Sequence, residues 1–239
     1  MKSATRVRVM PSNSFPPPSR WAPDGLVAVG GPLTPDRLSE AYRRGVFPWP
    51  VDESPQGLLW WSPDPRAILL PASLHIPRRL ARTLASGRFV VTADSCFEKV
   101  MEACATVGDR QEATWITPQI CDAYLQLHHR GVAHSVEVWR EGWLVGGLYG
   151  VCLGGMFAGE SMFSLERDAS KVALVRLVQA LHASGCMLFD VQVATDHLAQ
   201  FGVLEVDRDN FRRMLAFAVT GPDCWPATLL ALASAGPRS

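Results

Sequence analysis

Three strand-like segments follow one another in the middle of the chain, with only tight turns between them. The first spans Ala133–Arg140, the second spans Trp143–Val151 after a turn at Glu141-Gly142, and the third runs through Met156–Gly159. Consecutive strands joined by such short turns pair antiparallel. This region therefore predicts three neighbouring antiparallel strands, around which the remaining chain must pack.

A long apolar helix separates the third strand from a fourth. Residues Ser170–Ala183 are rich in Val, Leu and Ala, and Cys186–Val191 is a mostly apolar strand. A strand that follows its neighbour through a helical crossover lies parallel to it. We therefore expect an α/β fold (α+β, with a mixed sheet), antiparallel at first and partly parallel afterwards, which resembles the acyl-CoA N-acyltransferase (GNAT) architecture.

Further elements are expected on both sides of this region, from their capping residues and apolar spacing. They are a helix from Thr34 to Gly45, a strand at Ala67–Leu70, a helix after Pro77, a strand at Phe89–Thr92, helices capped by Asp94 and Thr117, a short helix from Thr195, a strand at Val203–Val206, and a final helix capped by Asp207. We place a domain boundary after residue 60. Residues 1–60 would form a small N-terminal domain, and residues 61–239 a GNAT-like catalytic domain.

Composition limits the classes of function. The 239 residues are 48% hydrophobic, which allows a sizeable core, and the 23 basic and 23 acidic residues cancel. A neutral chain is not expected to coat a polyanion, although a local basic patch stays possible. No apolar run reaches the roughly 18 residues that span a bilayer, and the basic N-terminus lacks the apolar segment of a secretory signal. We expect a soluble, cytoplasmic protein.

No metal site is expected. The six cysteines show no CxxC spacing and suit reduced thiols in a core. The nearest approach to a ligand group is His128, His129 and His134. The first two leave a helix on different sides, and the third lies beyond Gly131.

Two polar residues interrupt the end of the fourth apolar strand. Asp190 and Gln192 are two positions apart, so their side chains point to the same side of the strand. Strand ends of α/β sheets are frequent ligand sites, which makes the pair a candidate site. The alternative is that Asp190 caps the next helix while Gln192 faces solvent.

A lone carboxylate, Glu160, lies in the apolar run GGMFAGESMFS at 154–164. A buried carboxylate is costly unless it is paired or hydrogen-bonded, and burial alone raises its pKa. The neighbouring methionines are adaptable enough to line a pocket for more than one apolar side chain. The alternatives are a solvent-facing turn for Glu160 and ordinary core packing for its neighbours.

Tryptophans and arginines give two candidate surfaces for nucleic acid. Four tryptophans lie near predicted element ends, where they could stack on bases or pack between the domains: Trp49, Trp60, Trp61 and Trp115. The helix after Pro77 contains Arg78, Arg79 and Arg82, and residues 61–100 have six basic and three acidic residues, a local charge of +3. This is a candidate phosphate-binding patch, and the alternative is a solvated helix face.

Several motifs, in one order, resemble the leucyl/phenylalanyl-tRNA–protein transferase family. The most specific are WWSPDPRA at 60–67 and GESMFS at 159–164, and the resemblance covers roughly residues 15–215. Others are GLVAVGGPLTPDRLSEAYRRGVFPW at 25–49, HIPRRLARTL at 75–84, TWIT at 114–117, AHSVEVW at 133–139 and HLAQFG at 197–202. Ala81 and Ala85 depart from the family, which often has Lys or Arg there.

The resemblance implies an enzyme that moves Leu, Phe and, less well, Met from aminoacyl-tRNA to proteins that begin with Arg or Lys. The product would be an N-terminal degradation signal. No cofactor is implied, and we expect a monomer. The residues implied are Asp190, Gln192 and Glu160 in catalysis; Trp49, Trp115, Tyr42 and Tyr124 around the aminoacyl-adenosine; Phe157, Met162, Leu181 and Phe189 in an apolar pocket; and Arg78, Arg79 and Arg82 on the tRNA.

Two other functions compete with this one. A GNAT enzyme that uses acetyl-CoA needs backbone amides and glycines before a helix to hold pyrophosphate. The corresponding segment here, SMFSLERDASK at 161–171, has no glycine and contains two acids. A non-catalytic tRNA-binding module would not need the three polar residues Asp190, Gln192 and Glu160.

Overall fold

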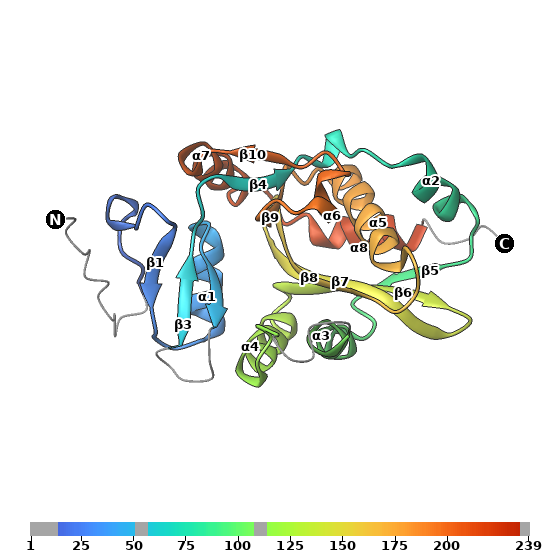
Figure 1. The fold of residues 1–239 in the computed structure, drawn as a ribbon, viewed down its shortest axis with the longest axis horizontal. Helices are drawn as coiled ribbons and strands as arrows, with labels where there is room; N and C mark the ends of the chain where they lie inside the picture. Colours follow the sequence, from blue (N-terminus) through green and yellow to red (C-terminus); the bar gives the residue numbers. More distant parts are fainter. Residues whose placement is uncertain (1–13, 51–56, 108–113, 235–239) are drawn as a thin grey trace.

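The computed structural model describes residues 14–50, 57–107 and 114–234 of the chain. Its described strands form a three-stranded and a seven-stranded sheet (Figure 1). The strands are β1 Leu26–Val29, β2 Phe47–Pro50, β3 Leu58–Trp61, β4 Arg66–Leu69, β5 Val90–Ala93, β6 Ala133–Arg140, β7 Trp143–Leu153, β8 Met156–Ser164, β9 Leu188–Gln192 and β10 Leu204–Val206. The helices are η1 Pro18–Arg20, α1 Pro35–Arg43, η2 Pro71–Ser73, α2 Arg78–Ala85, α3 Phe97–Thr106, α4 Pro118–His129, α5 Ala169–Ala183, α6 Asp196–Ala199, α7 Arg208–Ala218 and α8 Trp225–Ser234.

The small sheet has the order β1-β3-β2 and is antiparallel. None of these three strands is predicted from the sequence. β2 contains two prolines, which cannot donate to a neighbouring strand and are therefore confined to sheet edges, and β2 is an edge strand. α1 begins after Thr34, whose hydroxyl accepts a hydrogen bond from Arg37 N at 3.3 Å, so this predicted cap is confirmed.

The large sheet has the order β10-β4-β9-β8-β7-β6-β5. β6, β7 and β8 are neighbouring antiparallel strands, as the sequence predicts, and β8 extends beyond Gly159 to Ser164. α5 connects β8 to β9, and these two strands are parallel. The mixed α/β sheet is confirmed, whereas its likeness to the GNAT architecture stays a prediction.

Helices cover both faces of the large sheet. α3 and α4 lie on one face, and α5 and α8 lie on the other (Figure 1). Strand residues alternate accordingly: Tyr149 and Val151 of β7 join the core on the side of α3 and α4, and Leu148 joins the core under α5. Two buried apolar layers therefore fix the direction in which each polar strand residue points.

One predicted cap is wrong, and one helix was not predicted. Asp94 does not cap α3, whose N-cap is Cys96. Instead, Asp94 adopts a left-handed backbone and accepts hydrogen bonds from Ser135 N at 2.9 Å and from Trp225 Nε1 at 2.8 Å. Trp225 begins α8, which follows α7 and packs against α5, so α7 is not the last helix.

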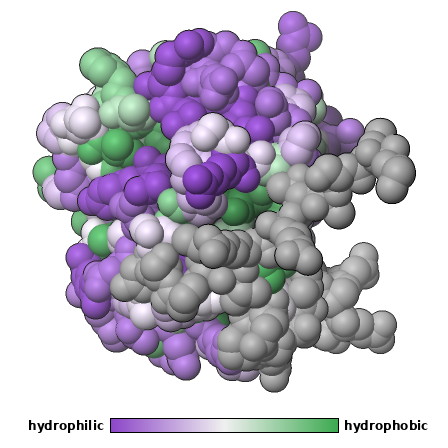
Figure 2. All heavy atoms as spheres, turned by 90° about the vertical axis from the view of Figure 1, so that its left-hand side faces the viewer, coloured by the Kyte–Doolittle hydropathy of each residue, from purple (hydrophilic) through white to green (hydrophobic). Residues whose placement is uncertain are grey.

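The two sheets meet in the chain at 61–66, where β3 ends and β4 begins. The domain boundary after residue 60 stays a prediction. The side of the molecule with the small sheet exposes mostly hydrophilic residues, with separate apolar patches between them (Figure 2). Within the described ranges, no helix has both the length and the apolar character needed to cross a bilayer.

Candidate functional site

Three neighbouring strands bring the predicted catalytic residues together. β9 lies between β8 and β4, with Ala158 opposite Asp190 on one side and Ile68 opposite Asp190 on the other. Glu160 follows on β8, two positions beyond Ala158, and Gln192 is the last residue of β9. The parallel β8–β9 pair therefore places Glu160 and Gln192 side by side at the carboxyl end of β9.

Asp190 is buried in an ion pair that the sequence analysis did not find. The guanidinium of Arg66, on β4, donates from Nε to Asp190 Oδ1 at 2.8 Å and from Nη2 to Oδ2 at 2.6 Å. Asp190 Oδ1 also accepts from Gln192 N at 3.0 Å. Both carboxylate oxygens are thus occupied. The alternative role as a helix cap is wrong, because Thr195 caps α6.

Gln192 connects Asp190 to Glu160. Its side-chain Nε2 donates to Glu160 Oε1 at 2.9 Å, while its backbone is bound to Asp190. The backbone φ angle of Gln192 is +59°, a left-handed conformation that residues other than glycine rarely adopt. Such strain persists only where the surroundings enforce it, and it is frequent at functional sites.

Glu160 is partly buried and hydrogen-bonded on both oxygens. Its Oε1 binds Gln192, and its Oε2 accepts from the Tyr124 hydroxyl of α4 at 3.2 Å. The Tyr124 hydroxyl also forms a hydrogen bond with Tyr42 of α1. The alternative that Glu160 faces solvent in a turn is wrong, since the residue lies within β8.

Burial raises the pKa of Glu160 to about 8. Hydrogen bonds from Tyr42 and Tyr124 and the charge of Arg66 lower this pKa, and the charge of Asp190 raises it. Burial also raises the pKa of both tyrosines well above 10, so their hydroxyls stay protonated. Near neutral pH the Glu160 carboxyl group can therefore gain or lose a proton.

Two of the predicted tryptophans lie against each other. The rings of Trp49 and Trp115 are stacked, with centroids 5.8 Å apart and planes 14° apart. Carbon–carbon contact takes about 3.5 Å, so a base between the rings would need them about 7 Å apart. A base can therefore reach the exposed face of Trp49, but it does not fit between the rings as they stand. Trp60 is fully buried and donates to Gly30 O at 3.1 Å, so it is not exposed to a base; its ring lies against Phe15 and Arg37.

The four predicted pocket residues come together in the core under α5. Phe157, Leu181 and Phe189 are buried, and the two phenylalanine rings meet edge to face at 5.6 Å. Met162 is partly buried and packs against this core. Phe157, Leu181 and Phe189 are closed to solvent, so Met162 is the member of the group that ligands can reach.

The predicted tRNA-binding arginines are all exposed. Arg78, Arg79 and Arg82 lie on α2, at the opposite end of the large sheet from the small one (Figure 1). No acidic group of the described chain lies within ion-pair distance of these three guanidinium groups. They are available to phosphate but do not reach the Glu160 cluster.

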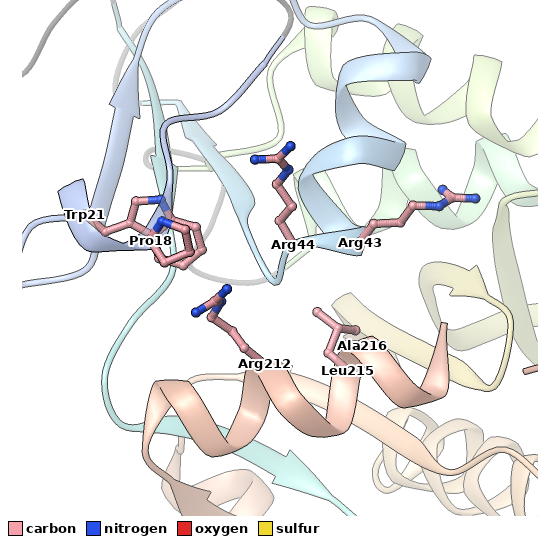
Figure 3. Close-up of a pocket in the computed structure, with 7 residues that line it drawn as sticks. All are labelled: Pro18, Trp21, Arg43, Arg44, Arg212, Leu215 and Ala216. Atoms are coloured by element: carbon pink, nitrogen blue, oxygen red, sulfur yellow. The ribbon is translucent and has the colours of Figure 1, made fainter. Parts of the chain in front are cut away.

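A separate crevice of about 200 Å³ lies between α1, α7 and the segment around Trp21 (Figure 3). Its lining residues are Pro18, Trp21, Arg43, Arg44, Arg212, Leu215 and Ala216. Arg44 pairs with Glu40 at 2.6 Å, and Arg212 pairs with Asp209 at 3.4 Å. None of the predicted site residues lines this crevice, so it is not the site that the sequence predicts.

His128 and His134, considered above as ligands, do approach each other, together with Asp94. Three of their four ring nitrogens already have partners: His134 binds Asp94 Oδ2 at 2.9 Å and Gly131 O at 3.1 Å, and His128 Nδ1 binds Ala133 O at 2.8 Å. These hydrogen bonds connect α4 with the segments at the end of β5 and the start of β6.

Comparison with known proteins identifies similar chains. Residues 68–216 match the family model described as leucyl/phenylalanyl-tRNA protein transferase, and residues 31–64 match the model of the N-terminal domain of that enzyme. A leucyl/phenylalanyl-tRNA–protein transferase of Anaeromyxobacter sp. (strain K) is 54% identical over 211 residues, which cover 87% of this chain and 89% of that protein. The enzyme of the same name from Pseudomonas putida (strain W619) is 48% identical over 214 residues, with coverages of 89% and 94%.

One solved structure, a conserved protein of unknown function from Bacteroides thetaiotaomicron, aligns with 67% of this chain and 57% of its own. The TM-score is 0.41 and the identity is 10%, a similarity too low to support a fold or a function.

Proposed function

The chain belongs to the leucyl/phenylalanyl-tRNA–protein transferase family, and we propose from this that it transfers an aminoacyl group from a tRNA to the N-terminus of a protein. The donors would be Leu-, Phe- and, less well, Met-tRNA, and the acceptors would be proteins that begin with Arg or Lys. Charged tRNA places the reaction in the cytoplasm. The product would be an N-terminal degradation signal, made by a monomer without a cofactor.

The reaction depends more on the orientation of the two substrates than on chemical activation of the ester. The ester between an amino acid and tRNA is already reactive, so the enzyme must hold the acceptor amine against the ester carbonyl. The amine must also be neutral, and the reference pKa of an α-amino group is near 8. A proton acceptor of similar pKa is enough to deprotonate it.

Glu160 is the group best suited to accept that proton. Its pKa of about 8 matches that of the amine, so proton transfer between them is nearly balanced. Asp190 forms a buried ion pair with the Arg66 guanidinium, which donates to both of its oxygens, whereas Glu160 accepts hydrogen bonds from neutral donors, the Gln192 amide and the Tyr124 hydroxyl. We therefore assign Asp190 to holding the cluster and Glu160 to proton transfer. Glu160 would take the proton of the amine as the amide bond forms and return it to the ribose oxygen of the tRNA as the ester bond breaks.

Gln192 would orient the amine. Its Nε2 faces Glu160, which leaves Oε1 to accept a hydrogen bond from the acceptor amine. The strained backbone of Gln192 fixes this direction. The amine would then lie beside the Gln192–Glu160 hydrogen bond, within reach of both side chains.

The donor would bind on the other side of the cluster. The terminal adenosine would stack on Trp49, near Trp115, with Tyr42 and Tyr124 beside the ester. The apolar side chain would enter at Met162, whose flexible thioether can move away from Phe157, Phe189 and Leu181. Such a pocket favours apolar side chains but discriminates weakly among them. The acceptor stem would reach the α2 arginines.

The observation on which the proposal depends is the Glu160–Gln192–Asp190 cluster in a chain of this family. One assay tests it against both alternatives. The protein is incubated with labelled Leu-tRNA, or with labelled acetyl-CoA, and with peptides that begin with Arg, Lys or Ala. We expect label from Leu-tRNA on the Arg and Lys peptides. Acetylation instead, or tRNA binding without transfer, would reject the proposal.

A further inference from the structure

Arg66 is one of the most buried charged residues of the molecule, with an exposed fraction of 1%. Its guanidinium donates to both oxygens of Asp190 and, through Nη1, to Gly45 O at 3.1 Å. The ring centroids of Phe47 and Phe211 lie 5.0 Å and 4.5 Å from it. The planar guanidinium group of Arg66 thus contacts residues of the small sheet, of the large sheet and of α7.

We propose that Arg66 is a positioning residue for aminoacyl transfer: it fixes Asp190, which fixes the backbone of Gln192, which in turn directs the Gln192 amide onto Glu160. Each link is a hydrogen bond of 3.0 Å or less. Arg66 does not touch the site of transfer itself. This inference rests on the proposed function.

The strained backbone of Gln192 supports this chain of contacts. A left-handed glutamine costs free energy, of the order of 1–3 kcal/mol, and persists only if its neighbours hold it. The bond that holds the Gln192 amide ends on Asp190 Oδ1, the oxygen to which Arg66 Nε also donates. If the Arg66 guanidinium no longer holds Asp190, the Asp190 carboxylate can rotate. The Gln192 backbone can then leave its strained left-handed conformation.

The Arg66–Asp190 ion pair also contributes to the electrostatic potential at Glu160. The groups that face Glu160 are Asp190 on β9, Arg66 on β4, Tyr42 on α1 and Tyr124 on α4, with Tyr149 of β7 nearby. Asp190 raises the pKa of Glu160 more than Arg66 lowers it. Neutralising both partners together should therefore lower the pKa of Glu160, whereas an ion pair that does not act on Glu160 would leave it unchanged.

Arg66 also contacts Gly45 and Phe47, close to the part of the chain that contains Tyr42. Gly45 lies just after α1, which contains Tyr42, and Phe47 begins β2. One guanidinium thus joins the strand end of the large sheet to the part of the chain that supplies Tyr42 to Glu160. Both sides of the cluster depend on the same side chain.

The first test compares two buried arginines. In R66K the positive charge remains, but an ammonium cannot hold both oxygens of Asp190 in a planar fork. We expect kcat for transfer to fall about 10- to 100-fold while KM for aminoacyl-tRNA stays within about twofold. The matched control is R37K, because Arg37 is equally buried, stacks on Phe15 and Trp60, and donates to Gly30 O. R37K should lower the melting temperature without lowering kcat.

The second test does not require activity. R66Q/D190N replaces the ion pair by two neutral groups that can still hydrogen-bond, which avoids an unpaired buried charge. We expect infrared difference spectroscopy to show the Glu160 carboxyl, identified by E160Q, titrating below about pH 8. Wild-type kcat in R66K, or an unchanged Glu160 titration in R66Q/D190N, would overturn the inference. A wild-type protein that transfers nothing would reject the proposed function, and the infrared titration would still test Arg66.

Discussion

Some residues of the candidate site can be recognised in the sequence, and others become apparent only in the structure. Asp190, Gln192 and Glu160 are visible because each interrupts an apolar strand pattern at a spacing that fixes its direction. Arg66 was missed because its partner lies 124 positions away, and an arginine at the start of a strand looks like a surface residue. The raised pKa of Glu160 likewise depends on burial, which requires the packed structure.

Glu160 should make the folded protein less stable at alkaline pH. The folded state keeps the Glu160 proton up to about pH 8, whereas the unfolded chain loses it near 4.5, so the free energy of unfolding falls as pH rises between these values. E160Q removes this fall. In urea denaturation, E160Q should be more stable than wild type at about pH 9 and equal to it at about pH 4.

The control for this prediction is E205Q, because Glu205 is exposed on β10. E205Q should follow the wild-type curve at every pH. If E160Q is no more stable than wild type at alkaline pH, burial does not raise the pKa of Glu160 in the folded protein.

Tyr124 should lower the pKa of the Glu160 carboxyl group. Its hydroxyl donates to Glu160 Oε2 and lowers the pKa of Glu160, so Y124F should raise that pKa and move the acidic limb of the kcat–pH profile to higher pH. Y149F is the matched control, because the buried Tyr149 hydroxyl has no hydrogen-bond partner in the described structure. A shift as large in Y149F as in Y124F would argue against a specific hydrogen bond.

Among the elements, capped helices and tightly connected strands were predicted best. Thr34 and Thr117 cap α1 and α4 as expected, because the Thr-Pro pair is a local signal. The strands of the small sheet were not predicted; β2 contains two prolines, which a strand pattern normally excludes. α8 was overlooked because it lacks a strong polar face, as befits a helix packed on α5.

The cap of α4 should contribute to stability. The hydroxyl of Thr117 accepts from Ile120 N at 3.3 Å, and loss of such a bond costs about 1 kcal/mol. T117A should lower the free energy of unfolding by about that amount in urea titrations. T117S retains the oxygen and should stay close to wild type. Equal losses in both variants would show that the Thr117 methyl group, and not the cap, is responsible.

The α2 arginines should contribute to tRNA affinity through charge alone. The triple variant R78A/R79A/R82A should bind tRNA more weakly and show a shallower dependence of log K on log salt, by about 0.7–0.9 per lost phosphate contact. R212A/R213A on α7 should leave the slope unchanged. A slope that falls in the α7 variant but not in the α2 variant would move the tRNA patch to α7.

For the whole molecule, connectivity predicted the class of fold but not the arrangement of the parts. Short turns and a helical crossover were enough for the mixed sheet. The insertion of β4 between β9 and β10 pairs strands far apart in the chain, which no local pattern indicates. That insertion brings Arg66 to Asp190, so the part of the site that sequence alone could not predict is the part set by long-range pairing.

The central claim is that Glu160 accepts the proton of the acceptor amine during aminoacyl transfer. The most direct measurement is the single-turnover rate of leucine transfer from Leu-tRNA to a peptide beginning with Arg, followed from about pH 6 to pH 9 in wild type and E160Q. We predict that the wild-type rate rises toward a plateau above about pH 8, and that E160Q is at least about 100-fold slower there. An E160Q protein that transfers leucine at the wild-type rate at every pH would contradict the account.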